Sequence, residues 1–166
     1  MNSIKLRPYV EVDISTLNSI RNDRQTLSMM NAVYTKHESM IDTQKWAANQ
    51  QAMGGFQIVE YLGECAGFIK SRPFSFGDRA CMHQEIGIVI TSTLRGKGVA
   101  SLAVFEYLSS VKEGRFLVRI IDDNSASKNL FLKIGFKEIG RVTGVITPNN
   151  DADEAYLDIV FMEYLK

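Results

Sequence analysis

The stretch TLRGKGVASLAVF, residues 93–105, joins a glycine-rich turn to an apolar pattern with helical spacing. Gly96 and Gly98 bring backbone without a Cβ, and Arg95 and Lys97 add positive charge. The first N–H groups of a helix have no partners within the helix and therefore bind anions. Because glycines let a phosphate approach these groups closely, the stretch predicts an anion-binding turn at a helix N-terminus.

Three phosphate-binding motifs compete for this turn. A Walker A loop needs glycine at the position of Thr91 and serine or threonine at that of Gly98, so it does not fit. The dinucleotide fingerprint needs a third glycine where Ser101 stands, in a βαβ unit near the start of a parallel sheet. The pattern Arg/Gln-x-x-Gly-x-Gly/Ala fits RGKGVA, residues 95–100, at every fixed position. A plain glycine turn with a basic rim is the remaining alternative.

The segment before the turn, QEIGIVIT at 84–91, is typical of a central strand. Alternation places three isoleucines on one face and Glu85, Gly87 and Val89 on the other. Both faces are largely apolar, as expected for a strand with neighbours on both sides and cover on both faces. After the turn, Ala100, Val104, Leu108 and Val111 keep one face of a helix.

The rest of the chain continues this alternation of strands and helices. Further strands are expected at residues 4–10, 56–62, 65–71, 115–121, 136–147 and 154–165, with Gly63 turning a hairpin. Further helices are expected after Asp13 as N-cap, from a Thr35/Glu38 capping box to Gly54, and at 124–135 with Gly135 at its end. The pattern predicts a mixed α/β sheet covered by helices.

Composition limits the classes of function. The 166 residues are 45% apolar and 23% charged, which is typical of one globular domain spanning 1–166. With 19 basic and 19 acidic residues the net charge is zero, so neither nucleic acid nor a membrane is an indicated partner. MNSIKLRPYV lacks a signal-peptide apolar region, and the only cysteines are Cys65 and Cys81. We therefore expect a reduced, cytoplasmic protein without a metal.

A second motif lies downstream, in DNSASKNLFLKIGFKEIG at 123–140. The strand and turn IGIVITSTLRGKGVA, followed by the Asn-led helix NSASKNLFLKIGF, resemble the GNAT superfamily of acyl-CoA-dependent N-acetyltransferases. The resemblance implies a mixed, mostly antiparallel sheet of about six to seven strands flanked by about four helices. IRND near the N-terminus and EIGRV with DADEAYLDIVFM near the C-terminus resemble the ribosomal-protein N-terminal, spermidine and amino-sugar acetyltransferases.

The resemblance implies acetyl-CoA as co-substrate and assigns residues to it. The pyrophosphate would lie on Arg95, Gly96, Lys97, Gly98, Val99, Ala100 and Ser101. The preceding strand would splay from its neighbour at a bulge, and its backbone at Ile88, Val89 and Ile90 would pair with the pantetheine arm. Asn124 and Ser127 would contact the same arm, and Lys133 the 3′-phosphate or ribose. The alternatives are a helix cap for Asn124 and a solvated cation for Lys133.

The resemblance also implies direct acyl transfer to a primary amine, which needs a group to accept the amine proton. Glu85 is the candidate base; the alternative is an ion pair with Arg72 or Arg119 that only holds the sheet. Many family members have a tyrosine at the position of Phe131, where its hydroxyl protonates the leaving thiolate. Here Ser127, Tyr156 or water would replace it, or the thiolate would leave unassisted, since a thiol pKa is about 8.5.

The acceptor would enter opposite the cofactor, over residues 21–38 and 148–155. The acidic residues Asp151, Asp153 and Glu154 would suit a polyamine or cationic peptide, or form a solvated turn. We favour an amino sugar or other small amine, with a protein N-terminus as the next candidate. The alternative function is a catalytically silent acyl-CoA-binding module, a sensor or assembly subunit, and homodimers are common in the superfamily.

Overall fold

The structure, a computed structural model, describes residues 4–30, 37–76, 79–146 and 156–166. Within these residues seven strands form one sheet in the order β1-β2-β3-β4-β5-β7-β6. The β4–β5 pair is parallel and the other pairs are antiparallel. The predicted mixed, mostly antiparallel sheet is therefore confirmed.

The strands are β1 (Ile4–Arg7), β2 (Phe56–Tyr61), β3 (Glu64–Phe76), β4 (Arg79–Ile90), β5 (Arg115–Ile121), β6 (Lys137–Ile146) and β7 (Leu157–Leu165). The helices are α1 (Ile14–Asn22), α2 (Arg24–Met29), α3 (Met40–Met53), α4 (Val99–Ser110) and α5 (Ser125–Ile134), with 3-10 turns η1 (Glu11–Asp13) and η2 (Ser92–Leu94). Strands β3 and β4 are longer than expected, because β3 continues past residue 71 and β4 begins before residue 84.

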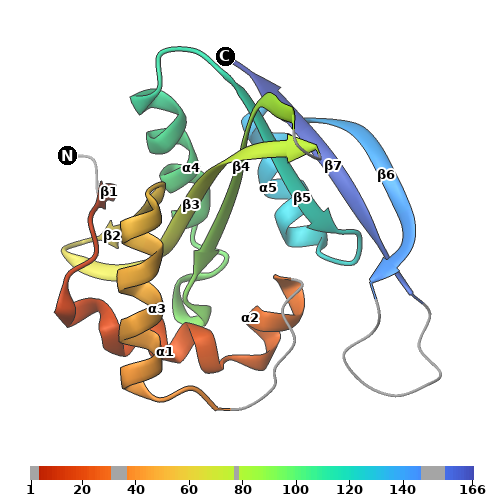
Figure 1. Cartoon of the computed structure of the whole chain (residues 1–166). Coiled ribbons are helices and arrows are strands. Elements are labelled where there is room, and N and C mark those ends of the chain that lie inside the picture. Colours follow the sequence, from red (N-terminus) through yellow and green to blue (C-terminus); the bar gives the residue numbers. More distant parts are fainter. Residues whose placement is uncertain (1–3, 31–36, 77–78, 147–155) are drawn as a thin grey trace.

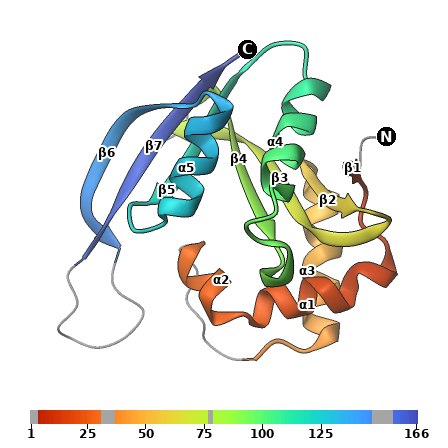
Figure 2. The same ribbon diagram turned by 180° about the vertical axis from the view of Figure 1, so that it is seen from behind.

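Helices cover both faces of the sheet. Figure 1 shows α1 and α3 on the near face, and Figure 2, from behind, shows α4 and α5 on the other. The α4/α5 face buries Ile86 and Ile90 of β4 in the larger apolar cluster, whereas Val89 belongs to the cluster under α1 and α3. The predicted division of β4 into two faces is therefore confirmed.

Two predicted glycine turns are present. Leu62 and Gly63 both adopt left-handed backbone, with φ of 54° and 88°, and join β2 to β3 in a two-residue hairpin turn. Gly135 follows α5 with φ of 109°, and its N–H donates to the carbonyls of Phe131 and Leu132. Glycine adopts such angles without steric cost, which is why the chain can reverse at both places.

Asp13 does not cap α1 as predicted. It closes η1 and its side chain makes no cap hydrogen bond to α1. Its carboxylate is buried and accepts from Nη1 and Nη2 of Arg7, at 2.7 and 2.8 Å, and from the N–H of Val10 at 2.9 Å. Asp13 therefore serves as the ion-pair partner of Arg7 and not as a helix cap.

The second predicted helix begins later than expected. Ser39 is the N-cap of α3, and its hydroxyl accepts from the N–H of Asp42 at 3.1 Å in a capping box. Thr35 lies outside the described residues, and Glu38 stands before the helix in an ion pair with Arg21. The same capping chemistry thus occurs, at a Ser/Asp pair displaced along the chain.

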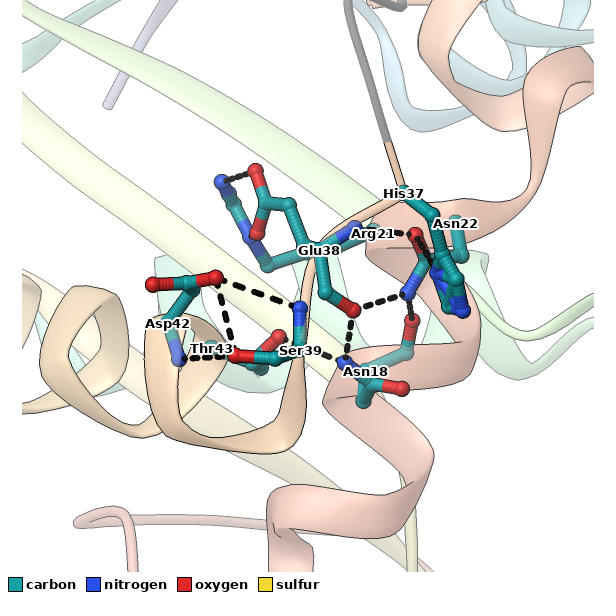
Figure 3. Close-up of polar contacts among 8 residues, drawn as sticks. All are labelled: Asn18, Arg21, Asn22, His37, Glu38, Ser39, Asp42 and Thr43. Carbon is teal, nitrogen blue, oxygen red and sulfur yellow. Dashed lines mark hydrogen bonds and ion pairs between the residues drawn. The ribbon is translucent and has the colours of Figure 1, made fainter.

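A polar network joins the C-terminal end of α1 to the start of α3 (Figure 3). Asn18 donates to the carbonyl of Glu38 at 3.0 Å and to the Thr43 hydroxyl at 2.8 Å. The Asn22 side-chain oxygen accepts from the Glu38 N–H at 2.8 Å, and its amide donates to the Glu38 carbonyl at 3.0 Å. The side chain of Arg21 is held beside α3 by its ion pair with Glu38, and its guanidinium carbon lies 4.2 Å from the centre of the Trp46 ring.

Candidate active site

The parallel strands β4 and β5 part within the sheet. They pair at three positions, the last of which opposes Glu85 to Leu117. Beyond that point β4 continues to pair with β3 as far as Ile90, and β5 continues to pair with β7 as far as Ile121. The two strands therefore diverge and open a cleft between their C-terminal halves.

The bulge expected at this opening is not there. The β3–β4 register is continuous from Gly67 opposite Ile90 to Pro73 opposite Gln84. The irregularity lies instead between Pro73 and Ser75 of β3. The opening therefore arises because β5 turns away, and β4 itself remains regular against β3.

The open edge of β4 presents unpaired backbone groups. The N–H of Thr91 donates to the Ala66 carbonyl on β3 at 2.9 Å. Since backbone groups alternate along an antiparallel strand, the peptide groups of Val89 also face β3, and those of Ile88 and Ile90 face the cleft. The carbonyl of Ile90 accepts from Nε of Arg95 at 3.3 Å, as this alternation requires. Within the described residues, the backbone of Ile88 faces the cleft without such a partner, whereas the backbone of Val89 faces β3.

The glycine turn leads from β4 into α4. Gly96 and Gly98 have φ of 72° and 79°, and Gly98 is the N-cap residue of the helix. No side chain of the described residues caps this end, and the first helical bond runs from the N–H of Leu102 to the carbonyl of Gly98. Apart from the chain neighbours of each glycine, no described residue has an atom within 4 Å of where a Cβ would stand. The N–H groups through Ser101 are therefore free of helical partners and open to an anion.

Arg95 is held by α2. Its Nη2 donates to the Thr26 hydroxyl at 2.5 Å and lies 3.2 Å from an oxygen of Asp23. The Thr26 hydroxyl in turn donates to Asp23 at 2.6 Å, which is the main reason the pKa of that carboxyl is lowered. Lys97, by contrast, is exposed and has no ion-pair partner among the described residues. Lys97 is therefore the freer cation of the turn.

The N-terminal end of α5 forms another wall of the cleft. Asn124 caps the helix through its side-chain oxygen, which accepts from the N–H of Ser127 at 3.0 Å. Asn124, Ser127 and Phe131 recur at helical spacing and all line the cleft. Phe131 is 3% exposed and packs edge-on against Phe136, with the two ring centres 5.0 Å apart. Lys133 is exposed on the other side of the helix and does not line the cleft.

Glu85 lies where β4 and β5 part. Its Oε2 accepts from Nε of Arg72 at 2.9 Å, and its Oε1 accepts from Nε of Arg119 at 2.5 Å. The alternative interpretation from sequence, an ion pair with either arginine, is therefore present with both. A carboxylate offers about four acceptor positions, so these contacts leave room for a water or an amine.

Lys70 is a cleft residue that sequence analysis did not identify. Its ammonium lies 4.8 Å from the centre of the Trp46 ring and 5.5 Å from that of Phe68. Burial, and then the charges of Arg21 and Arg72, lower the pKa of Lys70 to about 8. A lysine within an apolar strand, in the segment FIKS, was the only signal in the sequence.

The cleft has a volume of about 980 Å³ and extends through the parting of β4 and β5. Its lining includes apolar side chains of α2, α3 and the sheet, and polar ones of β3, β4, β5 and α5; among them are Met29, Met53, Phe56, Lys70, Arg72, Glu85, Arg119, Asn124 and Ser127. Tyr156 is exposed at the start of β7 and is not among these residues, while Asp151, Asp153 and Glu154 lie outside the described ranges. The volume suits a ligand of cofactor size.

Two other classes of site have little support within the described ranges. There, no three His, Cys, Asp or Glu side chains gather in a way that could hold a metal ion. In the same ranges, no helix is long and apolar enough to cross a membrane.

A parallel strand pair that parts beside an uncapped helix N-terminus places an open backbone edge and an anion-binding helix end in one cleft. The family model for the acetyltransferase (GNAT) domain matches residues 3–137. The chain therefore belongs to the GNAT acetyltransferases, enzymes that use acetyl-CoA. No curated protein sequence matches it.

Solved structures share the fold over nearly the whole chain. The yncA protein of Salmonella typhimurium, solved with acetyl-CoA, is 18% identical, with 99% of this chain and 94% of that chain covered and a TM-score of 0.76. The spermidine N-acetyltransferase of Vibrio cholerae, solved with CoA and spermine, is 17% identical, with 99% and 96% covered and a TM-score of 0.78. The ribosomal-protein-alanine N-acetyltransferase of Brucella melitensis is 22% identical, with 98% and 99% covered and a TM-score of 0.75.

Proposed function

We propose that this enzyme acetylates a primary amine within the cleft between β4 and β5, with acetyl-CoA held by β4, the glycine turn and α5. The proposal rests on one observation: β4, which parts from β5, leads through the glycine turn into the uncapped N-terminus of α4. The free backbone edge at Ile88 and the free N–H groups from Gly98 to Ser101 follow one another along the chain.

The residues present fit such a cofactor. The pyrophosphate carries negative charge, and the α4 N-terminus offers N–H groups, a positive dipole end and the exposed cation Lys97. The pantetheine arm carries amides, and the β4 edge and the side-chain amide of Asn124 offer hydrogen bonds to them. Bound acetyl-CoA would supply the acetyl group as a thioester.

The proposed roles of the side chains follow from their places in the cleft. In the net reaction a C–N bond forms, a C–S bond breaks, the amine loses a proton and the thiolate gains one. We assign proton removal to Glu85, directly or through a water, because its carboxylate retains acceptor positions at the parting of the strands. We assign the thiolate proton to Ser127, whose side chain lines the cleft one turn before the buried Phe131.

The two supporting relatives of known acceptor class differ in what they modify, a polyamine in one and a ribosomal protein in the other. A small amine, an amino sugar or a protein N-terminus are therefore the acceptor classes to test first. The proposal for the donor does not depend on that choice.

The test of the donor site is a thermal melt with acetyl-CoA, with ATP and NAD as controls. A ligand at one hundred times its Kd stabilises by about 2.7 kcal/mol, which for a chain of this size raises Tm by about 5–10 °C. No rise at millimolar acetyl-CoA would contradict the proposal.

A matched pair of variants separates binding from stability. Gly98→Ala and Gly63→Ala each force a side chain into left-handed backbone, at φ of 79° and 88°, with no atom in the way of the added Cβ. Each should lower the unliganded Tm to a similar extent, since the strain is about 1–2 kcal/mol at either place. Only Gly98→Ala should also diminish the rise caused by acetyl-CoA.

A further inference from the structure

Three cations gather on one face of the sheet at the parting of β4 and β5. On β3, Lys70 stands opposite Gly87 and Arg72 opposite Glu85, and directly opposed residues share a face. Glu85 is in turn the partner of Leu117, so Arg119, two positions along β5, lies on that face as well. This is the face that α1 and α3 cover elsewhere, opposite α4 and α5.

The charges on this face do not cancel among the described residues. Arg72 and Arg119 share the single carboxylate of Glu85, which leaves one positive charge in excess. Lys70 has aromatic neighbours and no acidic partner in the described part of the chain, so it adds a second. The nearby guanidinium groups of Arg21 and Arg95 are paired with Glu38 and Asp23 and add little.

The space beside Lys70 is open. Gly87, its partner across the strands, is exposed, and beyond its chain neighbours no described residue comes within 4 Å of where its Cβ would stand. Phe56, the β2 partner of Lys70, lines the cleft together with Met53, and the two give it apolar lining. A small molecule next to Gly87 would therefore lie between the half-buried Lys70 on β3 and Glu85, two residues away on β4.

We infer that the acceptor is an amine that also carries an anionic group, a carboxylate or a phosphate, which Lys70 binds while the amine faces Glu85. The inference rests on the proposed function, and it names the class of acceptor for that site. An uncompensated ammonium in a partly apolar setting attracts an oxyanion strongly, because little water competes for it. The lowered pKa of Lys70 agrees with this, since burial and then the charges of Arg21 and Arg72 disfavour its ammonium form, and a bound anion would offset both.

The test compares amines that differ only in the anion. L-Methionine is paired with L-methioninamide for the carboxylate, glucosamine 6-phosphate with glucosamine for the phosphate, and spermine serves as a polycation without an anion. Thiol release from acetyl-CoA gives kcat/KM for each amine. A melt with CoA together with N-acetyl-L-methionine or N-acetylglucosamine 6-phosphate, against their uncharged counterparts, gives a readout independent of turnover.

We expect the anionic member of one pair to exceed its counterpart by at least tenfold in kcat/KM, and the pair that responds identifies the anion. Lys70→Met should abolish that preference, Lys70→Arg should keep most of it, and the exposed Lys45→Met on α3 should leave it unchanged. The rise in Tm with acetyl-CoA alone should survive in all three variants.

Two results would overturn the inference while leaving the proposed function standing. One is a rise in Tm with acetyl-CoA combined with no advantage, in turnover or in melts, for either anionic compound. The other is an advantage that Lys70→Met does not diminish. Failure of acetyl-CoA to bind the wild-type protein would instead remove the proposed function and the inference with it.

Discussion

Arg119 of β5 donates through Nε to Oε1 of Glu85 at 2.5 Å, and Glu85 is the last residue of β4 that pairs with β5. The ion pair thus bridges the strands at the apex of the cleft. Arg72 on β3 holds the other oxygen of the same carboxylate, so three strands meet in one cluster of charges. Glu85 is in this way both a structural link and, among the described residues, the acidic side chain that lines the cleft.

Glu85→Gln should separate these two roles. If Glu85 accepts the amine proton, the substitution should lower kcat/KM by about 10²–10⁴-fold while acetyl-CoA still raises Tm. Arg119→Met is the control, because it breaks the same ion pair but retains the carboxylate. Equal losses of activity in the two variants would show that Glu85 only positions the strands.

Ser127→Ala should produce a loss of turnover that depends on pH. The hydroxyl is assigned to protonate a thiolate whose conjugate thiol has a pKa of about 8.5, so the acid matters only below that value. We expect kcat to fall several-fold at pH 7 and to approach that of the wild type above pH 9. A loss of the same size at both pH values would assign Ser127 to binding alone.

Lys70→Met should stabilise the protein at neutral pH. The folded state lowers the pKa of Lys70 from 10.5 to about 8, so below pH 8 the ammonium is desolvated at a cost that the thioether does not incur. Between pH 8 and about 10.5 the unfolded chain binds more protons than the folded one, and the wild type gains stability as pH rises. The advantage of the variant in Tm should therefore be full at pH 7 and diminished at pH 9.5, with Lys45→Met unchanged at both.

Asp13→Asn should be strongly destabilising. Asp13 is 1% exposed and receives two hydrogen bonds from the guanidinium of Arg7, so the amide would leave a largely buried cation with Glu60 as its remaining counter-charge. Removing one partner of a buried ion pair costs about 3–5 kcal/mol, and the Glu60 contact should keep the loss near the lower of these values. Chemical denaturation should show this loss, and the exposed Glu11→Gln in the same 3-10 turn should stay within about 0.5 kcal/mol of the wild type.

Sequence patterns located the strands and the glycine turn because those features depend on local chemistry. Alternation along 84–91 and the glycines at 63, 96, 98 and 135 dictate their structure without reference to the rest of the chain. Helix α2 was missed because six residues contain too little apolar periodicity, although Asp23 followed by Gln25 and Thr26 is a recognisable cap. A short helix of this kind is stabilised by tertiary contacts, here those of Arg95.

Long-range pairings explain the rest of what sequence did not provide. Asp13 has the residue type and place of an N-cap, yet its carboxylate binds Arg7, which precedes it on a strand. Lys70 appears in sequence as one cation in an apolar strand, and its significance depends on Gly87 and Trp46, which only the folded chain brings near it. The positive charge that Lys70 brings to the cleft could therefore not be predicted from the spacing of residues along the sequence.

The two cations of the glycine turn differ in the structure, although both belong to the same sequence motif. Arg95 opens the motif, but its guanidinium is bound to Thr26, Asp23 and the carbonyl of Ile90. Arg95→Gln should therefore lower Tm by detaching α2, and should weaken acetyl-CoA binding only through that loss of order.

Lys97→Gln should behave in the opposite way. Lys97 is exposed, so the substitution should leave the unliganded Tm within about 1 °C of the wild type, since surface changes cost little. It should weaken acetyl-CoA binding about two- to fivefold at low salt, because an exposed charge contributes about 0.5–1 kcal/mol, and the difference should fade at 0.5 M NaCl as the charges are screened. Calorimetric titration of both variants at two salt concentrations checks this contrast. A salt-dependent loss in Arg95→Gln with none in Lys97→Gln would show that the first residue of the motif leaves α2 and contacts the phosphates when acetyl-CoA binds.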